Sequence, residues 1–389
     1  MGIWQTFHRT FLGGTDAARA RVSQLDTLRG IAVLLIFFVH YHALMGHWLA
    51  PLGAGTALAG FGEALAHCGT DLFFTLSGYL IYSSLMTRQR PPGRFIARRF
   101  GRIYPTFVFV VAVYLLIFLL DPADSKLPLH LVPAILYVLA NLALLPGIFP
   151  IEPIVTPAWS LSYLALFYVT APLLVWALDL RSWRRRQRAL LFCLLATLLF
   201  AWGYFFGGPV RLAMFLGGMM LYEFRPHSMR LSGGRVSTLL FAGAAAIMAT
   251  ITALGIPAVV RFMTMFTLFP LASGACLTAS PLRGPLSWHW LQYLGRVSLS
   301  YIMIHGLTLQ LLLFATERLL PASWKNSALF WLLLVPAFIA TAVSAALVYT
   351  LIEDEGGSSG RIGNGAPSEN NIDGAPLRRD VEADSLRKR

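Results

Sequence analysis

Residues 25–40 read LDTLRGIAVLLIFFVH, and this stretch decides the class of fold. Its apolar run continues to about residue 47, giving a helix of about 20 residues, the length that crosses a hydrocarbon core of roughly 30 Å. Arg29 and His40 lie within this run, and ionisable side chains are costly inside a bilayer and usually mark a pathway or a site. The stretch therefore predicts a membrane-spanning helix with a functional face.

Apolar runs of this kind recur along the whole chain of 389 residues. Hydrophobic residues make up 57% of the sequence and charged residues only 13%, against about 25% charged residues in soluble domains. This composition excludes a soluble protein. Because backbone polar groups must be satisfied inside lipid, the predicted fold is an all-α polytopic membrane protein. The candidate spans are residues 28–47, 70–87, 103–120, 128–145, 158–179, 189–206, 210–224, 236–254, 258–279, 297–315 and 328–352.

The basic residues gather in short loops, and their distribution predicts the topology. Arg9, Arg19 and Arg21 place the N-terminus in the cytoplasm by the positive-inside rule, and the loop 48–67, which has no Lys or Arg, then lies outside. Six arginines in 88–102 return the chain to the cytoplasm. Topology therefore accounts for the formal net charge of +13, and no nucleic-acid partner is expected.

One apolar segment between the two strongest basic clusters cannot be a full span. Residues 88–102 and 181–188 should both be cytoplasmic, yet three apolar segments separate them, and an odd number of crossings cannot join two loops on the same side. We expect 128–145, followed by PGIFPIEPIVTP (146–157), to be re-entrant or partial. About ten transmembrane helices then remain, and both termini are cytoplasmic.

The chain divides into three parts. We expect a cytoplasmic N-terminal segment (1–27), a transmembrane domain (28–352) and a cytoplasmic tail (353–389) that has too little apolar surface to fold. The three cysteines are scattered and show neither metal-ligand nor disulfide spacing, so we expect no metal site.

Arg29 and His40 are eleven residues apart in one predicted helix. At about 100° per residue they share one face, and they are separated by roughly 16 Å along the axis. An imidazole has the unperturbed pKa that best suits proton transfer near neutral pH. The alternative is that Arg29 is a snorkelling anchor and His40 a hydrogen-bonded interior histidine.

Two further motifs allow a functional and a structural interpretation. In GTDLFFTLSGYLI (69–81), Asp71 and Ser77 are candidate site residues, but Asp71 could instead cap a helix and Ser77 could permit close packing. In RFIARRFGRIYP (94–105), the arginines recur along one helical face and could bind phosphates. The alternative is that these arginines only set the topology.

Taken together, the motifs resemble those of the acyltransferase-3 family, membrane-embedded enzymes that modify cell-surface glycans. The resemblance covers residues 24–353, and its motifs occur in the family's order. They are Arg29-x10-His40, residues 69–81, residues 95–105, PAWSLS (157–162) and LGRVSLSYIMIH (294–305).

The resemblance implies transfer of an acyl group, usually acetyl, from cytoplasmic acyl-CoA to a hydroxyl of an extracytoplasmic polysaccharide or glycolipid. Acetyl-CoA would be a co-substrate, no cofactor would be permanently bound, and polysaccharide synthesis or export machinery would be a candidate partner in the inner (plasma) membrane. By motif position, His40 would be the catalytic base, and Arg29, Arg98, Arg99 and Arg102 would bind acyl-CoA. The motif residues expected to line the site are Asp71, Ser77, Trp159, Ser160, Tyr301 and His305.

The chain departs from the family pattern at one position. Relatives usually carry a glutamate two residues after WSLS, where this chain has Leu164. Two other classes of function also fit a polytopic composition. They are a transporter or flippase of glycan precursors, and a non-catalytic subunit of a polysaccharide-export complex.

Overall fold

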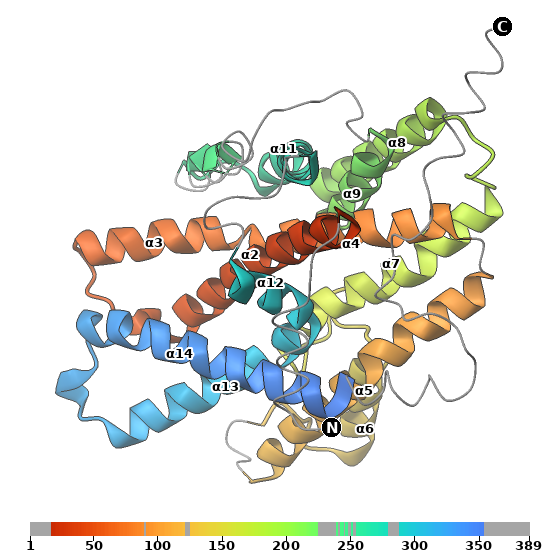
Figure 1. Ribbon diagram of the computed structural model, residues 1–389. Helices are drawn as coiled ribbons and strands as arrows, with labels where there is room; N and C mark the ends of the chain where they lie inside the picture. Colours follow the sequence, from red (N-terminus) through yellow and green to blue (C-terminus); the bar gives the residue numbers. More distant parts are fainter. Residues whose placement is uncertain are drawn as a thin grey trace, which may run out of the picture.

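Helices form the framework of the computed structural model, as Figure 1 shows. The structure describes residues 17–88, 91–120, 125–224, 254–278 and 288–353, together with scattered positions in 239–251. The long helices are α2 (Ala17–Met45), α4 (Gly69–Thr87), α5 (Pro92–Leu120), α7 (Ala158–Ala177), α8 (Arg185–Phe206), α11 (Ala258–Thr278), α13 (Ser298–Leu319) and α14 (Ser327–Val348). The shorter helices are α3 (Ala54–Ala66), α6 (Leu131–Leu142), α9 (Ala213–Glu223) and α12 (His289–Arg296). Single helical turns are η1 (Gly46–Trp48), η3 (Val210–Leu212), η5 (Ala322–Trp324) and η6 (Tyr349–Glu353).

Seven helices in the described part of the chain are long and apolar enough to cross a bilayer, which confirms the polytopic all-α class. Each corresponds to a span predicted from the sequence, with boundaries shifted by up to about ten residues. The spanning stretches are Gln24–Trp48, Pro92–Leu120, Ala158–Ala177, Arg185–Phe206, Val259–Leu277, Ser298–Leu319 and Ser327–Ile352. The total of ten spans and the side on which each terminus lies remain predictions.

Helix α4 lies at the centre of the bundle. It packs against α2, α7 and α9, and 13 of its 19 residues are buried. A Cβ added to Gly78 of α4 would lie 2.2 Å from the Phe215 carbonyl oxygen, and one added to Gly218 of α9 would lie 2.0 Å from that of Thr75. These glycines therefore let the backbones of α4 and α9 touch. Protein rather than lipid covers α4, which explains how it tolerates polar residues.

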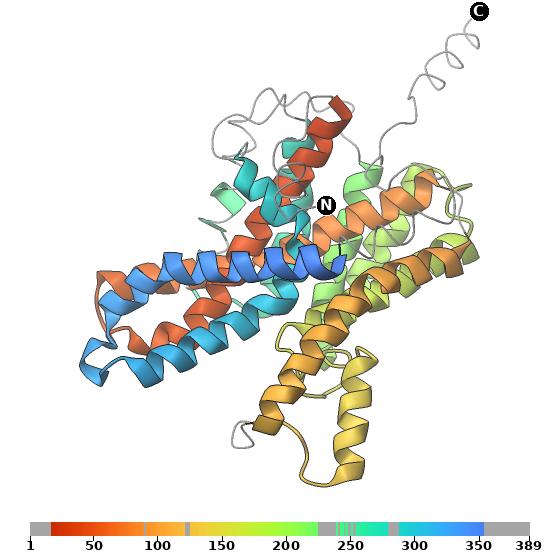
Figure 2. The same ribbon diagram turned by 60° about the horizontal axis from the view of Figure 1, so that its bottom comes forward.

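Several predicted segments differ from simple spans. The segment 128–145 contains only α6, whose 12 residues rise ~18 Å, too short to cross a bilayer, as the sequence predicts for a partial segment. Figure 2 shows α6 beside α5 at one end of the molecule. The segment 210–224 forms η3 and the 11-residue α9, whose apolar side chains are buried in protein. The predicted loop 48–67 contains α3, because its Ala- and Leu-rich sequence favours a helix.

Other predicted regions lie outside the described residues. The segment 236–254 does so in large part, and the tail from residue 354 does so entirely. Of the N-terminal segment 1–27, the described part is the beginning of α2.

A buried ion pair joins α4, α8 and α9. Arg188 of α8 binds Glu223 of α9 through two hydrogen bonds, from Nε at 2.7 Å and from Nη2 at 2.8 Å, and the Tyr82 hydroxyl of α4 donates to the same carboxylate at 2.5 Å. The second terminal nitrogen of Arg188 donates to the carbonyls of Leu180 and Trp183. The sequence assigned Arg188 only to the basic loop, whereas the structure shows that it holds three helices together.

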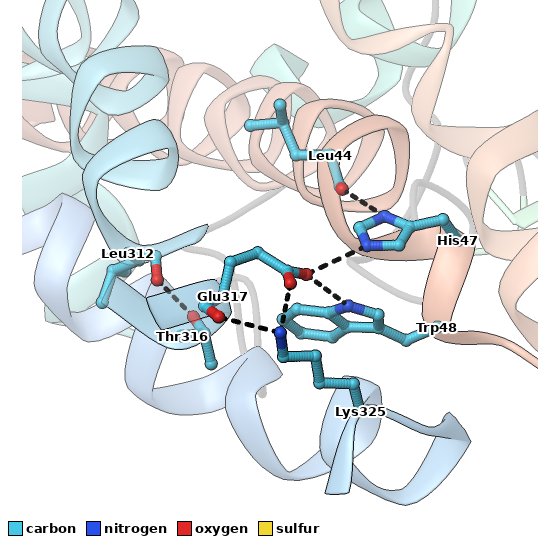
Figure 3. Close-up of polar contacts among 7 residues, drawn as sticks. All are labelled: Leu44, His47, Trp48, Leu312, Thr316, Glu317 and Lys325. Atoms are coloured by element: carbon cyan, nitrogen blue, oxygen red, sulfur yellow. Dashed lines mark hydrogen bonds and ion pairs between the residues drawn. The ribbon is translucent and has the colours of Figure 1, made fainter. Parts of the chain in front are cut away.

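A second polar cluster joins the C-terminal ends of α2 and α13 to the N-terminal end of α14, as Figure 3 shows. The carboxylate of Glu317, near the end of α13, accepts hydrogen bonds from Trp48 Nε1 at 3.0 Å and His47 Nε2 at 3.3 Å, and it pairs with Lys325. Lys325 also donates to the Glu317 carbonyl oxygen at 2.9 Å. The cluster fixes the turn between α13 and α14 against the end of α2.

Candidate active site

Helix α2 carries both residues of the first motif and packs against α4, α12 and α13. Gly30 and Gly69 allow this close packing, since a Cβ on Gly30 would lie 2.0 Å from the Leu291 carbonyl oxygen and one on Gly69 would lie 2.9 Å from that of Ala32. Arg29 and His40 are both partly accessible within this packed region. The α-helical geometry of α2 places them on one face, as predicted.

His40 lies next to His305 of α13. The two ring centroids are 5.0 Å apart, with the rings inclined at 58°. His305 is fully buried, and its Nδ1 lies 2.9 Å from the carbonyl oxygen of Tyr301. Because a carbonyl oxygen only accepts, Nδ1 carries the hydrogen, and in the neutral ring Nε2 then has the lone pair. Nε2 is buried and has no hydrogen-bond partner among the described residues, so His305 offers a free acceptor beside His40.

Tyr301 supports His305 from the same helix. Its ring stacks on the imidazole at 5.5 Å with an interplanar angle of 13°, and its hydroxyl pairs with Thr341 Oγ1 of α14 at 2.7 Å. Stacking and the Nδ1 hydrogen bond together restrict the orientation of the His305 ring. The motif LGRVSLSYIMIH thus places His305 as a candidate site residue and Tyr301 as its support.

Near the other end of α2, arginines from two helices are close enough for their charges to interact. The charges of Arg102 and Arg99 of α5 both act on Arg29, and we call these three residues the inner arginine cluster. Arg99 lies 5.8 Å over the ring of Tyr168 of α7, and Arg29 lies 5.9 Å over that of Phe73 of α4. The Nε of Arg29 is buried without a hydrogen-bond partner in the described structure. Clustered guanidinium groups with an unused donor suit a ligand with several phosphates.

Arg98 has a different setting from the cluster. It is exposed on α5 and, one residue before Arg99, projects about 100° away around the helix. The charges of Arg99 and Arg102 are among the largest acting on Arg29 and that of Arg98 is not, although Arg98 lies only about 40° around α5 from the equally exposed Arg102.

An ion pair beside the inner arginine cluster was not identified from the sequence. Arg296 Nε lies 3.3 Å from Asp26 Oδ2, and the charge of Asp26 also acts on Arg29. Gly295 permits this approach of α12 to α2, because a Cβ there would lie 1.9 Å from the Asp26 carbonyl oxygen. The sequence signal for this ion pair was the opposite charge of Asp26, just before the first motif, and Arg296, in the motif 294–305. The pair fixes α12 against α2 and leaves the cluster positively charged.

Asp71 of α4 faces an arginine that sequence reasoning also missed. Its Oδ1 lies 3.5 Å from Arg211 Nε, and Arg211 lies 5.1 Å over the ring of Trp159 of α7. The helix-cap interpretation of Asp71 is wrong, because Cys68 occupies the N-cap position and Asp71 lies inside the first turn. Arg211 thus brings Asp71 and Trp159 together, and we call these three residues the outer site. The sequence signal was the position of Arg211 in a predicted outer turn, where the positive-inside rule does not favour an arginine.

The two candidate serines have local roles. Ser160 Oγ donates to the Pro157 carbonyl oxygen at 2.8 Å at the start of α7, and Ser77 is buried beside Gly78 on α4. Their geometry supports helix packing rather than chemistry. Leu164, which replaces the usual glutamate, is also buried.

Tyr114 of α5 is a further candidate that the motifs did not indicate. Its hydroxyl is buried and has no hydrogen-bond partner within the described part of the chain. A Cβ added to Gly306, the residue after His305, would lie 3.7 Å from this hydroxyl and 3.9 Å from Pro157. An unused donor therefore lies beside Gly306, the neighbour of His305 in the sequence, where α13 meets the PAWSLS motif.

Comparisons with known proteins agree on one class. The family model described as an acyltransferase domain matches residues 22–350. The chain is 31% identical to "Protein 2 in picA locus" of Rhizobium radiobacter over 35% of this chain and 73% of that protein. It is 32% identical to the acyltransferase MdmB of Streptomyces mycarofaciens over 39% of each chain. It is 28% identical to a protein named as a membrane-bound transacylase, BcsY, of Komagataeibacter xylinus, over 46% of this chain and 43% of that one.

These matches are partial, since the last two relatives are matched over less than half of their length. No solved structure matches the chain.

Proposed function

The chain belongs to the acyltransferase-3 family, and we propose that it transfers an acyl group, acetyl first among them, from acyl-CoA to a hydroxyl of an extracytoplasmic glycan. One observation carries the proposal. The His40–His305 pair lies toward one end of α2 and the inner arginine cluster toward the other, and the start of α4, which carries Asp71 of the outer site, packs on α2 between them at residues 32–36. A donor held at the inner arginine cluster and an acceptor held at the outer site would both have to reach His40 along α2.

The inner arginine cluster is the proposed donor site. Arg29, Arg99 and Arg102 would hold the phosphates of coenzyme A, with the unpaired Nε of Arg29 as one available donor. From there the pantetheine arm has to cover the roughly 16 Å along α2 that separate Arg29 from His40. Arg98 would contribute to the general positive field rather than to a direct contact.

The chemistry requires one proton acceptor and one oxyanion donor. His40 would remove the proton from the acceptor hydroxyl as its oxygen attacks the thioester carbonyl carbon. The resulting tetrahedral oxyanion would be stabilised by a hydrogen bond from the Tyr114 hydroxyl. Collapse breaks the carbon–sulfur bond and forms the ester, and the proton held by His40 passes to the leaving CoA thiolate.

His305 would act on His40 rather than on the substrate. When His40 takes up the proton it becomes a cation with a second N–H, and the free Nε2 of His305 can accept that hydrogen bond. The Tyr301 carbonyl keeps His305 in the required tautomer. His305 is therefore proposed as a positioning residue.

The proposed setting is the inner (plasma) membrane, with polysaccharide synthesis or export machinery as a candidate partner. The membrane-spanning helices and the family support a membrane enzyme. The name of the relative BcsY, a membrane-bound transacylase, agrees with the reaction class.

The direct test compares surface glycans from cells that carry the wild-type chain, His40→Ala or no chain. We expect mass spectrometry to find an ester removed by mild alkali only in the wild type. His42→Ala is the matched control, because His42 pairs with Glu63 at 3.2 Å instead of with His305. Ester formation by His40→Ala at the wild-type level, with equal protein in the membrane, would remove His40 from the mechanism. A transporter or flippase predicts no ester in any of the strains.

A further inference from the structure

A second arginine faces the outer site. The charge of Arg261, in the first turn of α11, acts on Asp71 together with that of Arg211. Both arginines also act on His67, the residue at the end of α3. Burial lowers the pKa of the His67 imidazole, Glu63 opposes that shift and the two arginines add to it. The charges of two guanidinium groups, one from η3 and one from α11, therefore act on the same few residues.

The Asp71–Arg211 ion pair is too long for a good hydrogen bond between the two side chains. Its 3.5 Å separation exceeds the 2.7–3.2 Å of a good N–H···O hydrogen bond. Asp71 is only 2% exposed, yet its Oδ1 has no hydrogen-bond partner among the described residues. The Arg188–Glu223 pair, at 2.7 and 2.8 Å, shows that the same fold can build a closed ion pair. A buried carboxylate oxygen left open is costly, which is typical of a site prepared for a ligand.

The charges at this site are unequal. Arg211 and Arg261 face Asp71, while the nearby Glu63 already pairs with His42 at 3.2 Å and His67 at 3.8 Å. Both arginines also lie at predicted outer ends of their helices, where the positive-inside rule does not place them. A positive excess kept there suggests recognition of an anion, because arginine binds carboxylates and phosphates in a bidentate manner.

Aromatic side chains border the same site. Arg211 lies 5.1 Å over Trp159 and 5.4 Å over Phe262, and the Tyr163 ring lies 5.8 Å from that of Trp159. A sugar combines apolar C–H faces with hydroxyl groups, so aromatic surfaces beside an open carboxylate suit it.

We propose that Asp71, Arg211 and Arg261 bind an acceptor sugar that carries an anionic group, a carboxylate or a phosphate. Arg261 and Arg211 pair with the anionic group, and the open Oδ1 of Asp71 accepts a hydrogen bond from a sugar hydroxyl. The identification of this sugar as the acyl acceptor rests on the proposed function, whereas its binding does not.

Equilibrium binding to the purified full-length protein, without acyl donor, tests the proposal. The probes are a glucuronic acid-containing tetrasaccharide, its carboxyl-reduced neutral counterpart and a neutral tetrasaccharide bearing one phosphate. We expect the wild type to bind at least one anionic probe about tenfold more tightly than the neutral one, a difference of about 1.4 kcal/mol. The anionic probe that binds more tightly identifies the group as carboxylate or phosphate.

Arg261→Gln should reduce the preference to less than about threefold, and Arg261→Lys should keep part of it. Arg318→Gln is the matched control, because Arg318 is exposed on α13 over Phe314 and its loss changes the net charge equally. The Tm of each sample in detergent checks that the protein is folded. Equal affinity of the wild type for anionic and neutral probes, or an equal effect of Arg261→Gln and Arg318→Gln, overturns the proposal. Selective binding with no acyl transfer would instead contradict the proposed function and leave this site standing.

Discussion

A double-mutant cycle on His40 and His305 tests the central contact of the proposed mechanism. The ring centroids are 5.0 Å apart, close enough for a ring nitrogen of each residue to approach hydrogen-bond distance. His40→Ala removes the proposed base and should lower kcat by about 10²–10⁴-fold. His305→Asn keeps a donor for the Tyr301 carbonyl and removes the free nitrogen, so it tests the contact with little change in packing.

The size of the His305 effect follows from the hydrogen bond that is lost. The bond forms when His40 is a cation, and hydrogen bonds to charged groups contribute about 1.5–3 kcal/mol, so kcat should fall by about 10- to 150-fold. The double variant should be no slower than His40→Ala alone, because the His305 contact requires the His40 ring.

The assay follows release of CoA by the purified protein in lipid nanodiscs, with acetyl-CoA and the glycan acceptor varied in turn. The KM for acetyl-CoA should stay close to that of the wild type in both single variants. His305→Gln, whose amide reaches the position of Nε2, should recover part of the activity lost in His305→Asn. Two results would refute the reasoning: full activity of His305→Asn, or a double variant slower than His40→Ala by the whole His305 factor.

Three further outcomes are expected. Tyr114→Phe should lower kcat by about 10²-fold if the Tyr114 hydroxyl donates to the oxyanion. The Tm should stay unchanged or rise, because that hydroxyl has no partner in the described structure. Normal turnover of this variant would exclude the role. Arg99→Gln should weaken acetyl-CoA binding, measured by calorimetry, by about tenfold or more. Arg98→Gln, at the exposed position one residue earlier, should weaken it much less. Equal losses of affinity would contradict the inner arginine cluster as the donor site. Glu223→Gln leaves the Arg188 guanidinium buried without its charged partner and should cost about 3–5 kcal/mol of stability. The control Arg186→Gln, at an exposed position, should change the Tm in detergent very little. Similar shifts in Tm for both variants would argue against the buried ion pair.

The environment of Asp71 shows how far motif reasoning extends. The motif indicated that this acid matters, and its position at the start of a helix suggested a cap. Its partner Arg211 belongs to a turn that no motif covers, and Arg261 lies further along the chain on α11. An isolated arginine between apolar segments looks like a topology signal until packing shows which carboxylate it faces. The same holds for Arg188, whose partner Glu223 lies on another helix.

The amino-acid sequence by itself determined the class of fold, most of the spanning helices, the partial segment at α6 and the common face of Arg29 and His40. These features follow from the length of apolar runs and from helical periodicity, which are local properties. Tertiary structure alone decided that His305 lies beside His40, that the charges of Arg99 and Arg102 act on Arg29, and that α4 is the buried centre of the bundle. Those contacts join helices far apart in the chain, and they depend on close approaches such as that of Gly78 to Phe215, which no local pattern specifies.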